Sequence, residues 1–151
     1  MNRLSSLLLL VAMGLSACSQ DSGQTAEATY PSVPDDTVFM LWEKCDYIDF
    51  IFYNRSFSMS QDEQAQIRQT IRHISEATPV IDPACQPAGR IFFQVEGENA
   101  LQGDFFFQDG CTYFLFYEDG EIKYANEMTP LGVKFYNYVF TQVGNSPEED
   151  S

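Results

Sequence analysis

The chain has 151 residues, with 8 Lys and Arg, 22 Asp and Glu and one His, so its formal charge is −14 at pH 7. This length supports one domain with short tails. The acidity excludes nucleic acid as a partner, because phosphates are bound through clustered Lys and Arg, and it excludes a basic membrane-surface module for the same reason. An apolar content of 44% indicates a globular chain and excludes global disorder.

The N-terminus has the layout of a secretory signal. A single cation, Arg3, precedes an apolar stretch over residues 4–15. This stretch is too short for a bilayer-spanning helix, which needs about 20 apolar residues. We therefore expect it to direct the chain out of the cytoplasm.

The stretch runs into a short motif, Leu15-Ser16-Ala17-Cys18. A Leu, two small residues and a Cys at this place resemble the lipobox of bacterial lipoproteins. The resemblance implies cleavage before Cys18 and fatty acylation, of the palmitate type, at this Cys. Two or three acyl chains hold a protein firmly, since each buried CH₂ contributes roughly 0.8 kcal/mol and one chain alone holds weakly. Ser19 after the Cys favours the outer membrane, facing the periplasm, if the cell is Gram-negative.

Cleavage leaves a more acidic mature chain. Removal of residues 1–17 takes away Arg3 and no acidic residue, which leaves 134 residues and a formal charge of −15. Residues 18–36 are small, polar and Pro-containing, and they predict a lipidated flexible tether. Residues 144–151 predict an acidic tail. A single domain is expected over residues 37–143.

The domain is predicted to be α+β, with two helices. Ser60 and Glu63 form a capping-box pattern ahead of an apolar stripe at i, i+4 and i+7, which predicts a helix over residues 61–76. Thr129 is followed by a proline, a typical helix start, and predicts a second helix over about residues 130–142.

Residues 90–125 predict an antiparallel β meander of three to four strands, because two Asp-Gly turn signals separate aromatic runs. Residues 37–54 fit a helical stripe and a strand alternation equally well, so both readings stay open. Nine aromatic residues lie between Phe92 and Tyr117. Either other segments cover both faces of this sheet, or one aromatic face is open as a binding surface.

Three cysteines remain once Cys18 is acylated, and the periplasm permits disulfides. In a meander, the strand that follows Cys85 starts at the same sheet end as the strand that Cys111 opens. The disulfide Cys85–Cys111 therefore ranks first, and pairing of either cysteine with Cys45 stays open. No C-x-x-C occurs, so a thioredoxin-like redox site lacks its motif.

Residues suited to catalysis or metal binding are few. His73 is the only histidine, expected near the edge of the first helix's apolar stripe as a satisfied or solvent-facing side chain. No nucleophile-elbow, zinc-protease or phosphate-loop motif occurs, and His73 with three cysteines lacks the paired spacing of a zinc site. We expect no enzyme activity, no metal and no cofactor.

The candidate binding surface consists of acidic residues at predicted hairpin tips. These are Glu118, Asp119 and Glu121 at one tip and Glu96 and Glu98 at another. Such tips are commonly only solvated turns, but together with the net charge they would steer a cationic protein partner. The sequence thus predicts a membrane-anchored, non-enzymatic binding lipoprotein of the inhibitor or immunity type. The alternative is a structural or assembly subunit of an envelope complex.

Overall fold

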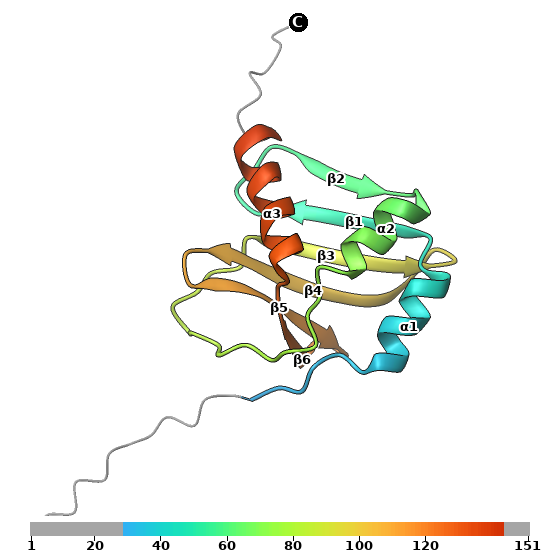
Figure 1. The fold of residues 1–151 in the computed structure, drawn as a ribbon, viewed down its shortest axis with the longest axis horizontal. Helices are drawn as coiled ribbons and strands as arrows, with labels where there is room; N and C mark the ends of the chain where they lie inside the picture. The colour runs from blue at the N-terminus through green and yellow to red at the C-terminus, as the bar shows by residue number, and fades with distance from the viewer. Residues whose placement is uncertain (1–28, 144–151) are drawn as a thin grey trace, which may run out of the picture.

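The structure, a computed structural model, describes residues 29–143. In chain order its elements are α1 (Asp35–Lys44), β1 (Tyr47–Phe52), β2 (Ser58–Gln61), α2 (Gln64–Ile71), β3 (Gly89–Val95), β4 (Glu98–Gln108), β5 (Cys111–Glu118), β6 (Glu121–Glu127), α3 (Pro130–Tyr138) and a π-helical turn, η1 (Val139–Val143). The fold is mixed α+β. Six antiparallel strands form one sheet in the order β2-β1-β3-β4-β5-β6, and the three helices lie over the same face (Figure 1).

The segment that the sequence left open is helix in its first half and strand in its second. Asp35 and Asp36 lie in the first turn of α1 and Lys44 in the last, an arrangement that the helix dipole favours. In β1, Ile48 and Phe50 are fully buried and alternate with exposed or half-buried residues. The helical stripe belongs to the first half of the segment and the strand alternation to the second, which is why the sequence shows both patterns.

Part of the predicted tether belongs to the folded domain. Val33 is 3% exposed, and its N–H donates to Asn126 Oδ1 at 3.0 Å. The N–H of Ala125 donates to the carbonyl of Pro31 at 2.9 Å, and Asn126 Nδ2 donates to the carbonyl of Ser75 at 2.7 Å. Asn126 thus ties both the entering chain and the segment after α2 to the edge strand β6.

Helix α2 is shorter than the predicted helix 61–76, and the capping-box prediction is wrong. Ser60 lies in the edge strand β2 opposite Asp49, so its backbone is committed to the sheet. Glu63 takes the N-cap position without a side-chain hydrogen bond. Two residues of the predicted apolar stripe, Ile67 and Ile71, are buried in the core.

The predicted meander is the β3–β6 part of a larger sheet, which β1 and β2 extend beyond β3. Two of its turns have left-handed backbone at both central residues. The φ values are +53° at Glu96 and +83° at Gly97, and +52° at Asp119 and +83° at Gly120. Two-residue turns of this hand match the right-handed twist of the flanking strands.

Helix α3 begins as predicted, with Thr129 Oγ1 accepting from the N–H of Gly132 at 3.3 Å. Its Tyr136 enters the core between the helices and the sheet. The other large side chains buried there are aromatic and aliphatic: Phe50, Phe93, Phe105, Phe114, Phe116, Leu41, Ile48, Ile67, Ile71 and Ile91. Within residues 29–143, no helix is long and apolar enough to cross a bilayer.

The opposite face of the sheet is covered over one half only. On β4–β6, Tyr30, Ile81 and Cys85 pack against a second buried cluster that includes Phe106, Tyr113 and Leu115. On β1, which lies toward the other edge, Tyr47 is 36% and Ile51 44% exposed. The aromatic sheet therefore has one covered face and one half-open face.

Candidate binding surfaces

The predicted acidic residues all lie at one end of the sheet. Antiparallel alternation places the β3–β4 and β5–β6 turns at the same end, where β1 also begins and β2 ends. Glu96, Glu98, Glu118, Asp119 and Glu121 are all exposed there.

Three further carboxylates that the sequence did not indicate join this end. Asp46 precedes β1, and its Oδ2 accepts a hydrogen bond from the N–H of Glu96 at 3.0 Å. Asp62 and Glu63 follow β2 and are exposed. We call these eight carboxylates the acidic end. They meet only through the pairing of strands distant in sequence, which is why single turns did not reveal the whole set.

One ion pair among the described residues partly offsets this charge. Lys123 Nζ lies 3.5 Å from Glu118 Oε2, and both side chains are 56% exposed. An exposed pair of this kind contributes little to stability. The acidic end therefore stays strongly negative.

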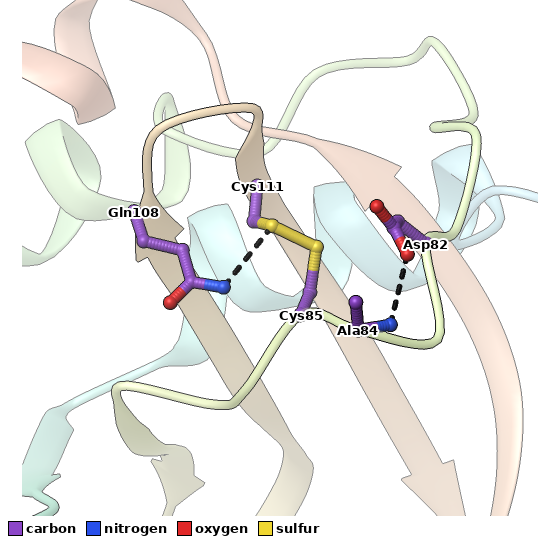
Figure 2. Close-up of a disulfide and its surroundings, with 5 residues drawn as sticks. All are labelled: Asp82, Ala84, Cys85, Gln108 and Cys111. Atoms are coloured by element: carbon purple, nitrogen blue, oxygen red, sulfur yellow. Dashed lines mark hydrogen bonds between the residues drawn. A yellow bond between two sulfur atoms is a disulfide. The ribbon is translucent and has the colours of Figure 1, made fainter.

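The structure pairs Cys85 with Cys111 and leaves Cys45 free and buried. Figure 2 shows this disulfide joining the loop before β3 to the first residue of β5, with the Gln108 amide donating to Cys111 Sγ at 3.3 Å. The loop also carries Asp82, whose carboxylate accepts from the N–H of Ala84 at 2.8 Å. The disulfide thus fastens the loop that covers half of the second sheet face.

A buried carboxylate lies where the covered half of this face meets the open half. Asp104, 6% exposed, is opposite Arg90 on the neighbouring strand. Arg90 donates to both of its oxygens, Nε to Oδ1 at 2.7 Å and Nη2 to Oδ2 at 3.1 Å. Tyr53 donates to Oδ1 at 3.1 Å and Tyr117 to Oδ2 at 2.8 Å. Four donors satisfy this carboxylate, so it has a structural role.

The surroundings raise the pKa of all three donor side chains. Desolvation, and then the hydrogen bond to Asp104, raise the pKa of Tyr117 to about 12. Desolvation and the Asp104 charge raise the pKa of Tyr53, and the hydrogen bond to Asp104 raises the pKa of Arg90. The two phenols therefore stay protonated, and the guanidinium charged, at neutral pH.

An open groove of about 670 Å³ lies between α1 and the chain that follows α2. Six apolar side chains line it: Val33, Val38, Phe39, Trp42, Ile71 and Ile74. Four charged residues stand among them, namely Asp35, Glu43, Glu76 and Arg72. The sequence did not indicate this groove, because its walls come from separate segments brought together by the fold.

His73 is neither satisfied nor solvent-facing, contrary to the expectation. Helix α2 ends at Ile71, and the chain then turns inward, so the ring of His73 is 1% exposed and lies 4.9 Å from the ring of Phe135. Neither ring nitrogen has a hydrogen-bond partner among residues 29–143. Burial lowers the pKa of His73 to about 4, which keeps the ring neutral.

The free cysteine, Cys45, is buried. Desolvation raises the pKa of the Cys45 thiol, so it stays protonated and packs as a small apolar group. Cys18, the lipobox and the acidic tail 144–151 lie outside the described residues. Among residues 29–143, no three His, Cys, Asp or Glu side chains are placed to hold a metal ion together.

Comparison of the chain with protein-family models, with curated proteins and with solved structures finds no match.

Proposed function

We propose that this protein is a lipid-anchored binding module of the bacterial cell envelope, held through Cys18, that captures a cationic protein and catalyses no reaction. The observation that carries this proposal is the acidic end, where eight exposed carboxylates gather at one end of a single sheet. A field of one sign attracts an oppositely charged partner and orients it during approach.

Two features support a location outside the cytoplasm. The lipobox-like run before Cys18 supplies an anchor, and Ser19 favours the outer membrane, facing the periplasm, in a Gram-negative cell. The disulfide Cys85–Cys111 is a cross-link that persists in oxidising compartments.

The anchor is tested with Cys18→Ala. We expect the native chain to incorporate labelled palmitate and to fractionate with membranes, whereas Cys18→Ala loses the label and becomes soluble. A Cys18→Ala protein that still fractionates with envelopes, without label, contradicts the proposed attachment.

The partner is tested by capture from periplasmic extract at low salt, with the full chain carrying Cys18→Ala as bait. The double variant Glu118→Lys/Glu121→Lys raises the net charge of the acidic end by four. Its control, Asp109→Lys/Glu127→Lys, adds the same charge at the opposite end of the sheet. We expect only the first variant to lose the captured protein. No capture, or equal loss in both variants, contradicts binding through the acidic end.

The half-open sheet face favours a second candidate, a structural subunit of an envelope complex. Tyr47 and Ile51 expose apolar surface there that an assembly would bury. This candidate predicts self-association of the Cys18→Ala protein, or apolar-dye binding that Ile51→Ser reduces. A strict monomer that binds no dye counts against it.

A further inference from the structure

The groove between α1 and the chain after α2 combines apolar walls with an acidic rim. Phe39 is 66% exposed at this groove, although its neighbours Val38 and Trp42 are half-buried. Large aromatic side chains left in solvent beside an apolar lining are typical of surfaces that bind another molecule. The groove volume of about 670 Å³ falls within the range of ligand sites.

The charges at the groove favour a cationic occupant. Asp35, Glu43 and Glu76 are exposed there, against one exposed cation, Arg72. A second cation, Arg68, is half-buried with its guanidinium over the Trp42 ring. None of the four exposed charges takes part in an ion pair among residues 29–143, so each is available to an incoming group. An occupant must therefore match an apolar wall with a predominantly negative rim.

One end of the groove, at Glu43, lies near the acidic end. Glu43 lies three residues before Asp46, and three residues span at most about 11 Å. Asp46 in turn is hydrogen-bonded to the backbone of Glu96 in the β3–β4 turn. A partner steered to the acidic end therefore meets the groove on the same side of the molecule.

We propose that this groove is the docking site for a basic amphipathic segment of the captured protein, an idea that rests on the proposed function. Aliphatic or aromatic side chains of the segment pack against Phe39, Trp42 and Ile74, and its Lys or Arg residues lie against Glu43 and Glu76. An amphipathic helix presents such anchors at i, i+3, i+4 and i+7, the spacing used when a helix lies in a groove. The acidic end then steers the partner, and the groove holds it.

Trp42 is the only tryptophan of the chain and lies in the groove, with the Arg68 guanidinium 5.2 Å from its ring centroid. Its fluorescence therefore reports occupation of the groove directly. The probe is a Trp-free Leu/Lys peptide of about 18 residues, which forms a helix roughly 27 Å long. A Ser/Lys peptide of equal charge and a neutral Leu/Ser peptide are its matched controls.

Two pairs of variants, made in the full chain carrying Cys18→Ala, locate the binding. Phe39→Ala removes an exposed aromatic from the groove, and Tyr138→Ala removes one of similar exposure, 63%, from α3. Glu43→Lys/Glu76→Lys reverses the rim, and Asp82→Lys/Asp109→Lys makes the same charge change at exposed residues that do not line the groove. We expect the Leu/Lys peptide to bind best and to shift Trp42 emission, and we expect Phe39→Ala and the rim reversal each to weaken binding about 10-fold. Neither control variant should change it.

Other outcomes overturn the docking site, and they separate it from the proposed function. Equal binding of the Leu/Lys and Ser/Lys peptides, unaffected by Phe39→Ala, leaves charge capture intact and removes the groove from it. Preferred binding of the Leu/Ser peptide or of palmitate identifies a site for apolar ligands instead. Dissociation of a dimer by Phe39→Ala identifies a second copy of the chain as the occupant. Unchanged Trp42 emission with every probe also rejects the groove. If no periplasmic protein is captured but the Leu/Lys peptide still binds, the cationic partner is rejected and the groove is not.

Discussion

At the scale of single residues, His73 is a source of acid sensitivity. Its folded-state pKa is about 4, because burial penalises the charged ring, whereas an unfolded histidine titrates near 6.5. Between these values the unfolded chain binds a proton that the folded chain does not. This contribution to stability is complete above pH 6.5 and falls as the pH falls toward 4.

We predict that His73→Leu removes this pH dependence. At pH 4.5 the native chain should have lost about 2.5 kcal/mol more of its unfolding free energy, relative to pH 7, than the variant has. Urea unfolding of both proteins at the two pH values measures the difference, and carboxylates shared by both proteins cancel. Parallel losses would show that His73 is charged or hydrated in the folded state.

The environment of Asp104 also allows us to predict a change in unfolding free energy. Asp104→Asn keeps the shape of the side chain but leaves the Arg90 guanidinium opposite a neutral amide. We expect the unfolding free energy to fall by about 2 kcal/mol, less than for a fully buried pair, because 34% of the Arg90 side chain is in solvent. Chemical denaturation measures it, and Lys123→Ala, which breaks an exposed pair at 3.5 Å, is the control expected to change little.

At the scale of elements, the disulfide and the loop that it fastens act as one unit. The bond joins positions 26 residues apart, so it restricts the unfolded chain as well as the folded loop. Chain-entropy arithmetic for a closed loop of this size gives roughly 3.5 kcal/mol of stabilisation.

We therefore predict that Cys85→Ser/Cys111→Ser lowers the unfolding free energy by about 3.5 kcal/mol. Cys45→Ala is the control for removing a thiol without a cross-link, and it should cost less because only one small buried group is lost. Urea titration of the oxidised proteins compares them. Equal destabilisation by the two changes would contradict a cross-linking role.

The sequence predicts elements well where one local signal dominates. The glycine-containing turns after Val95 and Glu118 and the cap at Thr129 need only their own neighbours, and the structure has turns and a helix start there. Ser60 shows the opposite case, since a capping box and an edge strand can use the same residues. Pairing with β1 stabilises the strand, and this pairing cannot be deduced from the local sequence.

The Arg90–Asp104 contact could not be predicted because it depends on a bulge. The β3–β4 turn pairs Gln94 with Asn99, and continuation of that register would place Arg90 opposite Gly103. A register shift between Phe93 and Gln94 skips one residue of β4 and brings Asp104 opposite Arg90. The groove could not be predicted either, because its walls are distant in sequence and meet only in the folded chain.

At the scale of the whole molecule, charge is distributed unevenly. The formal charge of −14 includes eight carboxylates of the acidic end, which repel one another in the folded state. Salt shortens the range of this repulsion from about 30 Å at 0.01 M to about 8 Å at 0.15 M.

We predict that the protein melts at a higher temperature in 0.15 M than in 0.01 M sodium chloride, because screening relieves this repulsion. Glu118→Lys/Glu121→Lys should show a smaller rise than the native chain, and Asp109→Lys/Glu127→Lys an intermediate one. Thermal unfolding followed by circular dichroism tests this. A melting temperature that falls with salt would mean that attractive ion pairs outweigh the repulsion.

The disulfide also determines how the chain responds to a protease. The exposed β3–β4 turn lies between Cys85 and Cys111, so a cut at Glu96 or Gly97 severs the backbone inside the cross-linked loop. The two fragments then remain covalently joined and migrate together on a gel until a reductant separates them. With the proposed anchor at Cys18, the disulfide would keep both halves of a nicked molecule at the membrane.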